Sequence, residues 1–107
     1  MKHQVLVVAE GEEDILDIYG YVLRTNGRSR ADYVLRKLLE TCQSLAELPL
    51  RGHSPPELER VGVHAFREVH FKPYRIIYQV AGRKVLIHCV LDGRRAVQEI
   101  LERRLLR

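Results

Sequence analysis

Cationic and titratable side chains suited to chemistry are concentrated between positions 66 and 95 of this sequence. They are Arg67, His70, Lys72, Arg75, Arg83, Lys84, His88, Arg94 and Arg95. Guanidinium and ammonium groups bind phosphate and carboxylate oxygens, and histidine exchanges a proton near neutral pH. This set therefore indicates an anionic partner, either a nucleic acid or an acidic peptide.

The charge is distributed unevenly along the chain, which agrees with that interpretation. Residues 49–107 contain 12 Lys/Arg and 6 Asp/Glu, whereas residues 1–48 contain 6 Lys/Arg and 8 Asp/Glu. A basic half is typical of a surface that meets an acidic partner. A basic face that is only solvated is the alternative, and the charge count fits both equally well.

The candidate residues also have structural alternatives. Arg75 has the alternative of an ion pair with Glu68 on a neighbouring strand, which contributes little if it is exposed. His88 lies between Ile87 and Cys89, where a histidine more often has a structural role. The C-terminal arginines fit the solvated face of a last helix, the terminal ones favoured by its dipole, and they fit equally a strip that binds the target or an acidic segment of a partner. They are Arg94, Arg95, Arg103, Arg104 and Arg107.

Three predicted strands position most of these side chains. Residues 66–71 alternate apolar and polar side chains, and residues 74–80 and 85–91 are rich in aromatic and β-branched residues. Lys72-Pro73 and Ala81-Gly82-Arg83 separate the strands and are short enough to force antiparallel hairpins. Such a meander exposes an apolar face that other elements must cover.

The alternation in the first strand sorts its side chains by face. Phe66, Glu68 and His70 share one parity. Arg67, Val69 and Phe71 share the other.

The N-terminal half predicts a strand and two helices. Residues 4–9 form a short apolar strand, expected to be buried on both faces and therefore central or well covered. A helix follows the acidic residues 10–14 and ends at Gly27, which suits a left-handed position after a helix. Ser29 is the expected cap of a second helix that Pro49 ends. The two helices form a hairpin whose apolar stripe covers the sheet.

The remaining segments complete an α+β fold. Residues 50–64 contain two prolines and two glycines with little apolar periodicity, which predicts a long loop. A last helix is expected over residues 94–106, with Asp92 as its cap. The order β-α-α-β-β-β-α gives one domain over residues 1–107, in which the three-strand antiparallel meander joins the N-terminal strand.

Composition narrows the class of protein. The 107 residues are 46% hydrophobic and 30% charged, an ordinary globular balance. No apolar run is long enough to cross a bilayer or to serve as a signal peptide, so we expect a cytoplasmic protein. Cys42 and Cys89 occupy apolar positions and are expected to be two buried free thiols. Without CxxC or paired His/Cys spacing, neither a metal site nor a cofactor is expected.

Three segments, taken in this order, resemble one family. They are LAELPLRGH at 45–53, FKPYRIIYQV at 71–80 and VLIHCVLDGRR at 85–95. With the order of elements they resemble the RelE/ParE superfamily of toxins from bacterial type II toxin–antitoxin modules over nearly the whole chain. The resemblance implies a small growth-inhibiting toxin of a plasmid stabilisation system, neutralised by a cognate antitoxin in a hetero-oligomeric complex.

The superfamily divides between two targets. RelE-like members cleave mRNA on the ribosome, and for that activity the resemblance implies Arg75 and Arg95 at the RNA. Arg67 would be a third positive group, and His88 or His70 would transfer a proton.

ParE-like members instead inhibit DNA gyrase. A nuclease-branch tyrosine of the last helix would fall near Ile100-Leu101, where this sequence is apolar. That absence, together with the ending HCVLDGRR at 88–95, favours a ParE-like, non-enzymatic gyrase inhibitor over the ribosome-dependent endoribonuclease. A degenerate member that only binds an antitoxin is the third hypothesis.

Two surfaces are then expected on the toxin. The basic one binds the target or its phosphates and consists of Arg67, Lys72, Arg75, Arg83, Lys84, Arg94 and Arg95. The other binds the antitoxin through apolar side chains left over from the helical hairpin, where a partner helix or extended segment docks. Its candidates are Leu16, Tyr19 and Leu23.

Overall fold

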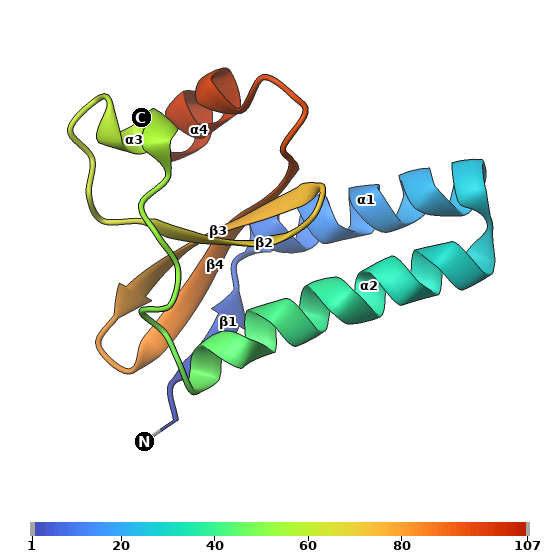
Figure 1. Ribbon diagram of the computed structural model, residues 1–107, viewed down its shortest axis with the longest axis horizontal. Helices are drawn as coiled ribbons and strands as arrows, with labels where there is room; N and C mark the ends of the chain where they lie inside the picture. Colours follow the sequence, from blue (N-terminus) through green and yellow to red (C-terminus); the bar gives the residue numbers. More distant parts are fainter. Residues whose placement is uncertain (1, 107) are drawn as a thin grey trace.

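The alternating pattern of residues 66–92 produces the three expected antiparallel strands. In the computed structural model, which describes residues 2–106, these are β2 (Arg67–Phe71), β3 (Tyr74–Ala81) and β4 (Lys84–Asp92). The N-terminal strand β1 (Gln4–Val7) pairs in parallel with β4, so the sheet has the order β1-β4-β3-β2. Helices cover both of its faces (Figure 1). The predicted α+β fold is confirmed.

The prediction that the N-terminal strand is buried on both faces is wrong. β1 lies at an edge of the sheet, and its side chains are at most half-buried. It also ends at Val7, because the backbone turns into a helix two residues later. A run of apolar residues does not distinguish a central strand from an edge strand that a helix covers.

Two long helices form the expected hairpin. Helix α1 (Ala9–Asn26) begins before the acidic cluster, which places Glu10 and Glu12 in its first turn. Gly27 has the predicted positive φ, 88°, but its ψ of 173° lies outside the left-handed helical region. Helix α2 (Arg28–Gln43) starts at once, so Gly27 is its cap and the predicted cap at Ser29 is wrong.

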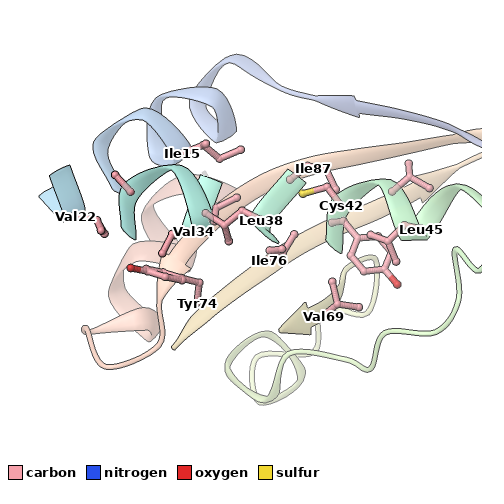
Figure 2. Packing of buried hydrophobic residues seen from close by; sticks show 14 residues of the cluster. Ile15, Val22, Val34, Leu38, Cys42, Leu45, Val69, Tyr74, Ile76 and Ile87 are labelled. Atoms are coloured by element: carbon pink, nitrogen blue, oxygen red, sulfur yellow. The ribbon is translucent and has the colours of Figure 1, made fainter. Parts of the chain in front are cut away.

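The hairpin packs on one face of the sheet and forms the larger of two hydrophobic clusters. Figure 2 shows α2 side chains lying over those of β3 and β4. The fully buried side chains here include Leu38, Leu45, Ile76, Tyr78, Val85 and Ile87. A 3-10 helix (Ser44–Ala46) continues α2 and ends its apolar stripe, close to the predicted stop at Pro49.

Two short helices cover the opposite face. Helix α3 (Pro56–Glu59) lies within the segment predicted to be a loop, and its Leu58 is fully buried. Helix α4 (Val97–Leu105) begins later than predicted, because Asp92 belongs to β4 and its carboxylate accepts a hydrogen bond from the backbone N–H of Arg94. The second cluster comprises Leu58, Ile77, Cys89, Leu91, Val97, Ile100 and Leu101.

A β-bulge in β4 decides which face its side chains occupy. Ile77 pairs with Cys89 and Tyr78 pairs with Ile87, which leaves His88 as the additional residue.

Cys42 and Cys89 are free and buried, as expected, and burial raises their pKa values to about 11 and about 12. No helix within residues 2–106 is long and apolar enough to cross a membrane.

Candidate functional site

Arg75 lies at the centre of a network of ion pairs between three elements. Its side chain extends from β3 toward Glu68 on β2 and Glu57 on α3. Nε and Nη2 donate to the two oxygens of Glu68 at 2.7 and 2.9 Å, and Nη1 and Nη2 donate to those of Glu57 at 2.7 Å each. Both pairs are therefore bidentate, the strongest geometry for a guanidinium and a carboxylate.

This network is largely withdrawn from solvent. The side chains of Arg75 and Glu57 are each 14% exposed, and that of Glu68 is 1% exposed. Hydrogen bonds from Arg75 lower the pKa of Glu57, and the two carboxylates raise the pKa of Arg75. Four of the five guanidinium N–H groups are used. The ion pair between Arg75 and Glu68 that the sequence offered as a structural alternative is present, and Glu57 forms a second ion pair with Arg75.

The two histidines proposed for proton transfer lie in different surroundings. His70 is the cross-strand partner of Arg75, and its Nε2 lies 3.1 Å from Glu68 Oε1. His88 occupies the bulge, with Nε2 3.2 Å from Gln79 Oε1 and its ring edge-on to Phe66. Burial, and next the Arg104 guanidinium, lower the pKa of His88. His70 therefore lies beside Arg75, and His88 belongs to a separate cluster.

Arg67 faces the other side of the sheet, because it alternates with Glu68. Its Nη1 donates to the carbonyl oxygens of Leu50 and Gly52 at 3.2 and 2.8 Å. Tyr78 Oη adds a hydrogen bond to the Pro49 carbonyl and accepts one from the Gly52 N–H. These contacts hold residues 48–52 against the sheet. The hydrogen bonds of Arg67 therefore have a structural role.

The other predicted basic residues occupy two ends of the sheet. Lys72 lies in the β2–β3 turn, and a hydrogen bond from Gly93 N–H to the Pro73 carbonyl joins this turn to the segment that carries Arg94 and Arg95. Arg83 and Lys84 lie at the β3–β4 turn, at the opposite end of β4. The predicted basic set therefore does not form one surface.

Arg104, expected from the sequence on a solvated or partner-binding face of the last helix, connects three elements instead. Its Nη1 donates to both oxygens of Asp14 on α1 at 2.9 Å, and Nη2 donates to the carbonyl of His88 at 2.8 Å. Its side chain is only 12% exposed. No local sequence pattern reveals this contact, because Asp14 lies 90 residues away along the chain.

A pocket of about 400 Å³ lies between α1 and the β3–β4 end of the sheet. Arg95 lines it together with Tyr21, Tyr74 and three aspartates. Arg94 is 72% exposed and holds Asp92 through Nε and Nη2. Arg95 is thus the basic residue at this end that faces a concave surface.

The outer surface of α1 carries exposed apolar side chains. Leu16 is 67% exposed and Leu23 is 40% exposed, whereas Tyr19 is half-buried and donates a hydrogen bond to Asp32 on α2 at 2.7 Å. A shallow groove of about 240 Å³ beside Leu16 is lined also by Val7, Ile15 and Leu39. Leu16 and Leu39 border it from both helices of the hairpin.

A family model and solved structures are similar to this chain. The family model described as the ParE toxin of the type II toxin–antitoxin system parDE matches residues 9–97. No curated protein matches the chain.

Two solved structures share the fold. A chromosomal ParDE toxin–antitoxin system from P. aeruginosa matches with a TM-score of 0.69 at 16% identity, over 83% of this chain and 94% of that chain. The toxin–antitoxin complex RelBE2 from Mycobacterium tuberculosis matches with a TM-score of 0.62 at 18% identity, over 84% of this chain and 96% of that chain.

Proposed function

Since the chain belongs to the ParE toxin family of type II toxin–antitoxin systems, we propose that it arrests growth by binding and inhibiting DNA gyrase without chemistry of its own. Its neutralising partner is a cognate antitoxin. In this proposal the toxin acts in the cytoplasm and serves to stabilise the replicon that encodes it.

The proposal rests on one observation, which is that the Arg75 guanidinium is already bound by the carboxylates of Glu57 and Glu68. A metal-free ribonuclease needs a cation at the scissile phosphate, because negative charge accumulates there in the transition state. Here two bidentate carboxylates hold the guanidinium of Arg75. Contact with phosphate would require it to leave both Glu57 and Glu68, and leaving two partly buried carboxylates unpaired is strongly unfavourable.

The binding surface that we propose for gyrase is the end of the sheet with exposed basic side chains. Lys72, Arg94 and Arg95 are exposed, and the hydrogen bond from Gly93 to Pro73 keeps their segments together. Arg83 and Lys84 form a second basic edge at the far end of β4. The antitoxin would cover α1 through Leu16, Tyr19 and Leu23, so the two partners would meet different surfaces.

The alternative is a ribosome-dependent mRNA endoribonuclease of the RelE type. His70 favours it, because its side chain is 40% exposed and lies directly across from Arg75. An exposed imidazole beside an arginine has the placement that a general acid or base needs.

Two assays on toxin released from its complex test the proposal. One measures supercoiling by gyrase, and the other measures cleavage of mRNA on translating ribosomes. We expect loss of supercoiling with intact mRNA, and at least about tenfold weaker inhibition by the double variant Lys72→Ala/Arg95→Ala, which corresponds to about 1.4 kcal/mol.

The matched control is Arg24→Ala/Arg103→Ala, which removes the same charge from exposed positions elsewhere. It should inhibit gyrase like the wild type. Cleaved mRNA with unaffected gyrase would instead establish the RelE-type activity and make His70→Ala the next variant to test.

A further inference from the structure

Three side chains with metal-ligand chemistry gather at the edge of the sheet formed by β2. They are His53, Glu68 and His70, and one ligand atom from each lies within 4.8 Å of the other two. Local spacing does not reveal this group, because His53 is 15 residues before Glu68 along the chain. The gyrase-binding function proposed above does not use it.

Backbone hydrogen bonds fix two of these residues face to face. The N–H of His53 donates to the carbonyl of Glu68 at 3.1 Å, and the N–H of Glu68 donates to the carbonyl of His53 at 2.7 Å. His70 follows Glu68 by two positions on β2, so both side chains leave the strand on the same face. The three side chains therefore converge because of the backbone rather than through a chance surface contact.

The carboxylate of Glu68 lies between the two imidazoles. His70 Nε2 is 3.1 Å from Glu68 Oε1, and His53 Nδ1 is 3.8 Å from Glu68 Oε2. Ligand atoms of a tetrahedral zinc site are separated by about 3.3 Å, given bonds of about 2.0 to 2.1 Å. The histidine side chains are 60% and 40% exposed, so each ring is able to turn, and His53 Nδ1 would exchange the Ser54 carbonyl oxygen, 3.1 Å away, for a common ion.

Glu68 retains acceptor capacity despite its ion pair. A carboxylate offers about four lone-pair sites on two oxygens, and Arg75 uses one site on each oxygen. Each oxygen therefore keeps a site for a further partner, and each has one histidine nitrogen within 3.8 Å. Arg75 then orients the carboxylate in the way that outer hydrogen bonds orient metal ligands.

The electrostatic balance also suits a cation. Glu57 and Glu68 together carry one more negative charge than Arg75 neutralises. Two imidazole nitrogens and one carboxylate oxygen are the donor set of zinc and similar divalent transition metals, not of magnesium or calcium.

We propose that His53, Glu68 and His70 bind one divalent transition-metal ion of the zinc class, with a water molecule completing its coordination. The ion would cross-link the segment before α3 to the edge strand β2. This inference is independent of the gyrase-binding surface proposed above.

Isothermal titration of the untagged, reduced, chelator-treated full chain with zinc chloride tests the site. We expect one ion per chain in this titration. In a thermal melt at a metal concentration 100 times the dissociation constant, we expect the melting temperature to rise by roughly 10 °C. His53→Ala and His70→Ala should each weaken binding at least about tenfold. Both positions are exposed, so the variants should fold like the wild type.

His64→Ala is the matched control, because His64 is exposed and lies outside the cluster. It should bind zinc like the wild type. The proposal is overturned if the wild type takes up no zinc, or if zinc binding survives unchanged in both His53→Ala and His70→Ala.

Discussion

The side chain of Arg75 connects three elements that are separated along the sequence. Arg75 brings β2, β3 and α3 together through Glu68 and Glu57. The residue that resembles a nuclease cation is thus a structural ion-pair centre first. Any role in phosphate binding would have to compete with two carboxylates.

We predict that Arg75→Met destabilises the fold by about 3 to 5 kcal/mol, because it leaves two carboxylates without their partner, and Glu68 is only 1% exposed. Urea denaturation measures the change. Arg103→Met, at an exposed position of α4, should change the free energy of unfolding by less than about 0.5 kcal/mol. Equal stability of the two variants would show that the network contributes little.

His88 should make the stability depend on pH. Burial and the Arg104 guanidinium lower its pKa in the folded chain, whereas the unfolded chain protonates it near 6.5. The unfolded state therefore binds more protons as the pH falls below 6.5, and the free energy of unfolding decreases in that window.

We predict that His88→Gln loses less stability than the wild type between about pH 7 and about pH 5, measured by urea denaturation at each pH. His64→Gln, at an exposed position, should follow the wild type. Parallel pH profiles for wild type and His88→Gln would contradict the lowered pKa.

At the level of elements, the loop before α3 is fixed by a close approach to the sheet. A Cβ at Gly52 would meet the backbone oxygen of Glu68 and the Oη of Tyr78, both at 2.6 Å. The same Oη receives the N–H of Gly52, so the glycine cannot move away without losing that hydrogen bond.

We predict that Gly52→Ala destabilises the protein by about 1 to 3 kcal/mol, through overpacking at this contact. Gly20→Ala is the opposite case. A Cβ there meets only the tip of the flexible Arg24 side chain, at 3.2 Å, within helix α1. It should stabilise the protein by about 0.5 to 1 kcal/mol. Thermal melting of the two variants should shift in opposite directions.

The elements differ in how far sequence patterns predict them. The faces of β2 were predictable, because Glu68 and His70 alternate with Val69 and Phe71 in a half-buried strand. The edge position of β1 was not, since its pairing with β4 is set by the whole topology. Helix α3 was missed because four residues beginning with proline carry no helical period.

In the candidate site too, contacts between neighbouring strands are predictable from the sequence, and contacts between distant segments are not. The pairing of Arg75 with Glu68 is predictable from strand alternation. The pairing with Glu57 is not, because the fold brings Glu57 from a segment 18 residues away. The contact of Arg104 is unpredictable for a similar reason, since its partner Asp14 is 90 residues away.

On the scale of the whole molecule, the proposed partners divide the surface. The basic end near Lys72 and Arg95 would face gyrase, and the outer surface of α1 would face the antitoxin. If these surfaces are separate, changes on α1 should affect neutralisation and leave gyrase inhibition intact.

We predict that Leu16→Lys/Leu23→Lys weakens binding of the cognate antitoxin at least about tenfold, because it removes apolar contacts at a docking surface. Titration calorimetry with the antitoxin measures the loss, and gyrase inhibition should be unchanged. Leu48→Lys/Leu50→Lys is the matched control, since it adds the same charge at two leucines that are each 62% exposed. Unchanged affinity in the double variant would place the antitoxin elsewhere.

The two edges of the sheet have a consequence for self-association. One edge is β1, a strand of four residues, and the other is β2, whose outer side is bridged at Glu68 by His53. Short or covered edges give another chain little backbone with which to pair. We therefore expect toxin released from its antitoxin to resist stacking into fibrils, so that it persists as single molecules until it meets its target.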